Sequence, residues 1–186
     1  MKKNYQSIVK LFGIVFLLTL LLTPVVSAQP AMQYLNIIGS GFKPVSTTQN
    51  FDTNAGCLFS TGGTDGFNFP VLLPRGSLIK YLEFFYYDAN PTTVTSLRLT
   101  KTDTFADPTT STTLFTLSTE VNTGKAKRIS TELNITVETN CSVDPQCFYT
   151  LGWGSGIPND TQRLCGARIH YIPPFGAVAL PLIKKD

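Results

Sequence analysis

The stretch Leu78-Ile-Lys-Tyr-Leu-Glu-Phe-Phe-Tyr-Tyr-Asp88 decides the fold, because it is the densest aromatic run in the chain. Pro74-Arg-Gly76 precedes it and Asp88-Ala-Asn-Pro91 ends it, and aromatic and aliphatic residues between turn formers are typical of a β-strand. Successive side chains of a strand point to opposite faces, and both faces of this one are largely apolar. The stretch is therefore predicted to be a central strand with something covering each side.

The two faces of this strand differ, because only one of them contains a charge. Glu83 cannot easily be buried without a partner, so we expect the opposite face, with Leu82, Phe84 and Tyr86, to enter the core. Three aromatic residues then point outward in a row, which is an unusual apolar patch for a surface. The candidate interaction surface consists of Tyr81, Phe85 and Tyr87. A loop over residues 43–54, a neighbouring subunit or a sugar ring would cover it.

The rest of the chain has the pattern of further short strands, separated by glycine, proline, asparagine and aspartate. Residues 43–54 are polar and are predicted to be a surface loop, whereas residues 126–138 are predicted to be one long strand. No window has a helical period with capping residues at its ends. Eight to nine short strands favour an all-β fold, an antiparallel β-sandwich of jelly-roll type.

The N-terminus has the pattern of a secretion signal. Met1–Lys10 carries three lysines and no acid, and Leu11–Leu22 is an apolar run that only one glycine and one threonine interrupt. Small residues at Val26-Ser-Ala28 provide a cleavage site, so residues 1–28 are predicted to be a signal peptide. The apolar run is shorter than the roughly 20 residues that a spanning helix needs. We expect a β-sandwich domain at 29–172, a C-terminal tail at 173–186 and no membrane span after cleavage.

The net charge and the composition of the chain limit the classes of partner that it is expected to bind. Cleavage would remove Lys2, Lys3 and Lys10, which leaves 12 basic residues against 12 acidic ones. A chain that is near neutral and has no basic run is not expected to bind nucleic acid. Few charges, with many threonines, glycines and aromatic residues, are typical of an extracellular β-protein. The protein is therefore predicted to be secreted or to lie at the cell surface.

The four cysteines are predicted to form disulfides, because their number is even in a chain that is expected to be exported. Three pairings are open. Cys141 and Cys147 bracket Ser-Val-Asp-Pro-Gln, which has the pattern of a turn, so this pair is predicted to close a hairpin; Cys57 and Cys165 then pair by elimination. A metal site is not expected, since the chain has no Cys-x-x-Cys and only one histidine. No cofactor is expected either.

No pattern identifies a catalytic residue, so we expect a protein that is not an enzyme. Four aspartates fall in predicted loops, where aspartate ordinarily forms turns and where calcium binding is the alternative. These residues are Asp65, Asp88, Asp103 and Asp107. His170 is predicted to be an exposed strand residue rather than a base or a ligand, because burial of the apolar face of its strand turns it outward. Trp153 is predicted to pack in the core.

Four short motifs occur in a fixed order along the chain. They are Gly56-Cys-Leu-Phe59, Phe67-Asn-Phe-Pro70, Tyr81-Leu-Glu-Phe-Phe-Tyr-Tyr-Asp88 and Arg163-Leu-Cys-Gly-Ala-Arg-Ile-His-Tyr171. Together they resemble an uncharacterised group of secreted bacterial β-sandwich proteins, over residues 55–171. The group keeps a cysteine in both end motifs, so the resemblance implies a bond between Cys57 and Cys165. It implies no activity, and Cys141 and Cys147 would be an addition in this chain.

Two classes of function are compatible with this sequence. The first is a structural or interaction module of the cell surface that associates with itself through outward aromatic residues, which makes a homo-oligomer the expected partner. The second is a carbohydrate-binding module, whose partner would be an extracellular glycan. The tail after Pro174 is expected either to fold back on the domain or to act as a sorting or docking element.

Overall fold

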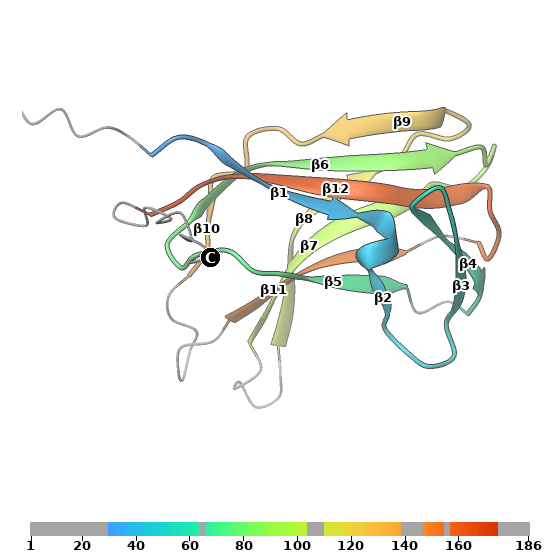
Figure 1. The fold of residues 1–186 in the computed structure, drawn as a ribbon, viewed down its shortest axis with the longest axis horizontal. Coiled ribbons are helices and arrows are strands. Elements are labelled where there is room, and N and C mark those ends of the chain that lie inside the picture. Colours follow the sequence, from blue (N-terminus) through green and yellow to red (C-terminus); the bar gives the residue numbers. More distant parts are fainter. Residues whose placement is uncertain (1–29, 64–65, 104–109, 139–146, 155–156, 175–186) are drawn as a thin grey trace, which may run out of the picture.

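The chain folds into two antiparallel sheets that pack face to face (Figure 1). This computed structural model describes residues 30–63, 66–103, 110–138, 147–154 and 157–174, and the predicted signal peptide and most of the predicted C-terminal tail lie outside them. Twelve strands and one short 3-10 turn, η1 (Gly39–Gly41), are present in the described residues. The predicted all-β antiparallel sandwich is confirmed.

Sheet A contains seven strands, with β6 and β12 at its centre. One side of β6 pairs with β9 and β10, and the far side of β12 pairs with β1 and β4; β3 then pairs with β4. The bounds are β1 (Gln33–Ile38), β3 (Asn50–Asn54), β4 (Cys57–Gly62), β6 (Leu78–Asp88), β9 (Gly124–Ile129), β10 (Ile135–Thr136) and β12 (Gln162–Ile172). The aromatic strand is therefore central, as predicted.

Sheet B contains five strands in the order β2-β5-β11-β7-β8. Their bounds are β2 (Lys43–Pro44), β5 (Phe67–Val71), β7 (Ser96–Asp103), β8 (Thr110–Ser118) and β11 (Cys147–Gly154). Figure 1 shows this sheet below sheet A, with β11 crossing behind β5.

The core lies between the two sheets. Leu82, Phe84 and Tyr86 are at most 1% exposed, which confirms the inner face that was predicted for β6. Trp153 is also 1% exposed, and its ring lies 5.5 Å from the ring of Phe67, so its predicted place in the core is confirmed. Large rings filling the space between two sheets bury much apolar area, which is the main stabilising term of such a domain.

The expected number of eight to nine strands is wrong, because several strands are short or polar. Residues 43–54, which were predicted to be a loop, contain β2 and β3. β3 pairs with β4 through the turn Ala55-Gly56, in which both residues have positive φ, as a two-residue hairpin turn requires. Every residue of β3 is exposed, so this strand needs no hydrophobic alternation and leaves no such signal in the sequence.

The predicted single strand at residues 126–138 is also wrong, because it is interrupted beside a bulge in β6. The register of β6 with β12 skips Lys80. On the other side of β6, Ser130 Oγ accepts a hydrogen bond from Leu82 N–H (2.9 Å), and Leu133 N–H donates to the carbonyl of Lys80 (2.8 Å). A side-chain hydroxyl and an irregular backbone thus replace the ladder between β9 and β10.

A disulfide joins Cys57 on β4 to Cys165 on β12, across a sequence separation of 108 residues. The pairing predicted for these two cysteines is confirmed. Cys147 begins β11 and is also disulfide-bonded, whereas Cys141, its predicted partner, lies outside the described residues. The bond between Cys141 and Cys147 stays a prediction.

Candidate functional site

The outer face of sheet A gathers aromatic and cationic side chains from β1, β4, β6, β9 and β12. We call it the aromatic–cation face. Strand alternation places its members opposite the buried set of β6, and the register of β6 with β9 and β12 brings them side by side. Its members are Tyr34, Phe59, Tyr81, Glu83, Phe85, Tyr87, Lys127, Arg163, Arg168 and His170.

Two arginines of β12 stand between rows of rings from the neighbouring strands. The guanidinium carbon of Arg163 lies 4.9 Å from the ring centre of Tyr87 and 5.7 Å from that of Phe59. The guanidinium carbon of Arg168 lies 5.6 Å from the ring centre of Phe85 and 5.7 Å from that of Tyr34. Cations over aromatic rings at these distances are attracted by the ring quadrupole. The rings of neighbouring strands are thus held against the two guanidinium groups of β12.

Glu83 is the carboxylate at the centre of this face, and it is only 4% exposed. Lys127 Nζ lies 3.2 Å from its Oε1, and Arg168 Nη1 lies 3.3 Å from its Oε2. A buried carboxylate is tolerated when cations of this kind hold it. The side chain is on the outer face, as predicted, and its partners on β9 and β12 explain why it is nevertheless buried.

His170 also lies on this face, but the prediction that it is exposed is wrong. Its side chain is 13% exposed, because its ring packs edge-to-face against Tyr34 (4.8 Å) and Tyr81 (5.8 Å). Its Nε2 lies 3.6 Å from Glu83 Oε2, and no hydrogen bond reaches that nitrogen within the described part of the chain. The register that pairs Tyr34 with His170 causes this burial, and it joins residues too distant in sequence for a local pattern to reveal.

The three residues of the predicted interaction surface, Tyr81, Phe85 and Tyr87, all lie on the aromatic–cation face and are half-buried. The segment 43–54, which was one of the expected covers, instead supplies β2 and β3. Cations of adjacent strands lie over Phe85 and Tyr87, and the ring of His170 packs against Tyr81. Sequence reasoning missed Tyr34, Phe59, Lys127 and Arg163, because only the register between strands distant in sequence brings them beside the outer residues of β6 and β12.

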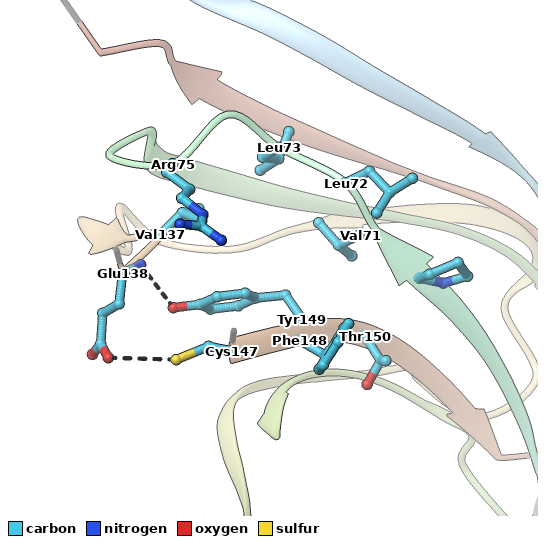
Figure 2. A pocket seen from close by; sticks show the side chains of 11 residues that line it. Val71, Leu72, Leu73, Arg75, Val137, Glu138, Cys147, Phe148, Tyr149 and Thr150 are labelled. Carbon is cyan, nitrogen blue, oxygen red and sulfur yellow. Dashed lines mark hydrogen bonds between the residues drawn. The ribbon is translucent and has the colours of Figure 1, made fainter. Parts of the chain in front are cut away.

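A cavity beside the end of β5 and the start of β11 is the other candidate site, and Figure 2 shows the side chains that line it. This cavity of about 310 Å³ is lined mainly by apolar side chains from the end of β5, the start of β11 and the segment after β10. Glu138 is its acidic group; its N–H donates to Tyr149 Oη (3.0 Å), and its carboxylate accepts from Lys101 Nζ (2.5 Å). This hydrogen bond raises the pKa of Lys101 above its ordinary value. Glu138 is thus engaged by Tyr149 and Lys101.

Two of the four candidate calcium ligands are described by the structure. Asp65 and Asp107 lie outside the described residues, and Asp88 and Asp103 end β6 and β7. Asp88 is fully buried, where its carboxylate accepts hydrogen bonds from Asn90 N–H (2.9 Å) and from the hydroxyl of Thr119 (2.6 Å). It therefore fixes a turn. Within the described residues, no three histidine, cysteine, aspartate or glutamate side chains are grouped to hold a metal ion.

Comparisons with known proteins give one structural neighbour of note. No family model matches the chain, and no curated protein matches it. A mutant of a family 29 carbohydrate-binding module, which was solved to study ligand recognition, covers 76% of this chain and 91% of its own, with 10% identity and a TM-score of 0.40. The two proteins are too distant for one to inform the function of the other. No helix in the described residues is long and apolar enough to cross a membrane.

Proposed function

We propose that this protein is an extracellular carbohydrate-binding module that holds a polysaccharide on the aromatic–cation face. The observation that carries the proposal is the alternation of rings and guanidinium groups across that face, with Arg163 and Arg168 each between two rings. Rings offer apolar contact to the C–H groups of a sugar, and guanidinium N–H groups donate to its oxygens. An extended chain needs such an open surface rather than a closed pocket.

The rigidity of the face supports binding rather than catalysis. Glu83 is held by Lys127 and Arg168, so its carboxylate serves to position these cations. A general acid would need a carboxyl group that can release and take up a proton beside the substrate, and glycosidases use two of them. The module is thus proposed to bind without a reaction.

An extracellular location is part of the proposal. The predicted signal peptide at residues 1–28 supports it, and so does the bond between Cys57 and Cys165, because disulfides persist mainly in oxidising compartments. A polysaccharide partner is available in that environment.

Self-association is the second candidate function, and two exposed apolar residues of β1 favour it. Tyr34 is 55% exposed and Ile38 is 60% exposed, and both point outward from sheet A. Tyrosine is enriched in protein interfaces. The cations count against this candidate, because two copies that meet through the same face would bring Lys127 and Arg168 of each copy toward like charges.

A polysaccharide pull-down on the purified mature domain tests the proposal, with Tyr34→Ala as the variant. Tyr34 is an exposed ring, so its removal is expected to weaken retention while the domain stays folded. Thr116→Ala, an exposed residue of sheet B, is the matched control and should bind like the wild type. Light scattering on the same samples should report a monomer. A stable oligomer that Tyr34→Ala dissociates, with no retention on any polysaccharide, would instead support self-association.

A further inference from the structure

The charges of the aromatic–cation face are arranged by depth. The side chain of Glu83 is 5% exposed, whereas those of Lys127 and Arg168 are 52% and 39% exposed. The carboxylate of Glu83 is therefore buried, and the side chains of the two cations extend into solvent. A ligand approaching the centre of this face meets cationic N–H groups before it meets any carboxylate.

The single negative charge of Glu83 neutralises only half of the positive charge of Lys127 and Arg168. Each oxygen of Glu83 contacts one cation, so one negative charge faces two positive charges. Arg168 forms an ion pair with Glu83 through Nη1 and donates a hydrogen bond through Nε to Asn36 Oδ1 (2.6 Å). A guanidinium has five N–H donors, so this residue keeps donors for a ligand. Lys127 has three donors, and the structure gives it one carboxylate partner among the described residues.

The other acidic side chains lie at the edges of the face. Asp160 forms an ion pair with Arg163 (3.2 Å). Asp52 on β3 is paired in register with Phe59 on β4, so both side chains point to the same side of the sheet. Lys125 on β9 is exposed and is paired in register with Tyr87 on β6. It adds a positive charge beside Lys127. The half of the face formed by β6, β9 and the end of β12 near Arg168 thus presents a surplus of positive charge to solvent.

We infer that the ligand of this face is an acidic polysaccharide, whose sugar units carry carboxylates that bind between Lys127 and Arg168. This inference rests on the proposed function, which it narrows. Guanidinium and ammonium groups form charge-assisted hydrogen bonds with carboxylates, and these are stronger than bonds to hydroxyl groups. The rings beside the two cations, Tyr34 and Phe85, would contact the body of the same sugar units.

Affinity electrophoresis or calorimetry with two forms of one polymer tests the inference. Polygalacturonate carries a carboxylate on each unit, and its methyl ester has the same backbone without the charge. The wild-type domain should bind the acid form at least about tenfold more tightly, and added salt should weaken that binding, as for other charge-assisted contacts at a surface. Lys127→Gln and Arg168→Gln should each reduce the preference for the acid form. Arg98→Gln, at an exposed arginine on the outer face of sheet B, should leave it unchanged.

The outcomes separate the inference from the proposed function. Equal binding of both polymers, or tighter binding of the ester, overturns the inference while the module still binds polysaccharide. Failure to bind these two polymers together with a panel of neutral glucans, mannans and xylans overturns the proposed function as well. If Arg168→Gln melts early because Glu83 loses a partner, Lys127→Gln and the comparison of the two polymers on the wild type still decide the result.

Discussion

The two sheets of this protein have outer faces of opposite character. The outer face of sheet A carries large rings and long cations around a buried carboxylate. The outer face of sheet B carries mostly short hydroxyl side chains and a single arginine in β7, β8 and β11. The outward side chains of these three strands are Ser96, Arg98, Thr100, Thr102, Ser111, Thr113, Thr116, Ser118, Phe148 and Thr150.

The comparison teaches how a sheet face can remain open to solvent. Short hydroxyl residues suit a strand and are solvated by water, so sheet B needs no cover. A row of exposed aromatic rings would form an apolar patch that favours aggregation. In sheet A, cations from the adjacent strands pack over such rings. Such an arrangement is costly to specify, because it needs correct register across five strands. The face that is more demanding to build is therefore the better candidate for function.

The largest expected effect comes from removing the disulfide of sheet A. Cys57→Ala with Cys165→Ala should lower the free energy of unfolding by about 4–5 kcal/mol in the chain-entropy model, because the bond closes a loop of more than a hundred residues. Urea denaturation of the double variant measures it. A loss below about 1 kcal/mol would mean that the pairing of β4 with β12 holds this edge without the bond.

Glu83→Ala should cause the next largest loss, because it leaves Lys127 and Arg168 without their shared carboxylate. We expect about 2–3 kcal/mol, less than for a fully buried ion pair, since both cations can recover water. Thr100→Ala on the outer face of sheet B should stay within about 0.5 kcal/mol. If the two substitutions cost the same, the contrast between the faces has no energetic basis.

The substitution His170→Ala tests whether the packed rings on the outer face of sheet A contribute to stability. An exposed histidine would give a change within about 0.5 kcal/mol, whereas a ring packed between Tyr34 and Tyr81 should cost about 1–2 kcal/mol. Chemical denaturation of His170→Ala and of His170→Phe separates the two cases. The phenylalanine variant keeps an aromatic ring against both tyrosines, so it should recover part of the loss.

The smallest effect concerns the ion pair of Lys101 with Glu138 beside the cavity of Figure 2. Because the pKa of Lys101 is raised in the folded state, its contribution to stability is fully present below the unfolded pKa and is lost as pH rises through the folded pKa. Lys101→Met should therefore cost a few tenths of a kcal/mol at pH 8, and this cost should vanish once the pH exceeds the folded pKa of Lys101. A cost that grows with pH in this range would contradict the raised pKa.

Local patterns predicted most of the fold. The aromatic content of residues 78–88 placed β6 at the centre of a sheet, and alternation within it selected the inner face correctly. Pairing by elimination, together with the resemblance, likewise predicted the bond between Cys57 and Cys165. These features depend on neighbours in sequence or on a simple count of cysteines, so one chain is enough to reveal them.

The remaining features depend on register between distant strands. Outward aromatic residues Tyr81, Phe85 and Tyr87 were predictable from alternation, but the side chains that pack against them come from β9 and β12. The burial of His170 follows from a strand more than 130 residues away. Register of this kind is fixed by packing over the whole sheet, and no local signal in the sequence records it.

The most direct test of the central proposal is to map where a polysaccharide binds. Backbone amide resonances of the isotopically labelled domain should be followed by NMR while soluble acidic oligosaccharide is added. Shifts should concentrate on β6, β12 and β9, around Phe85, Lys127 and Arg168, while the outer face of sheet B stays unchanged. Shifts that concentrate on sheet B or around Tyr149 at the end cavity would contradict the assignment of the aromatic–cation face as the binding surface.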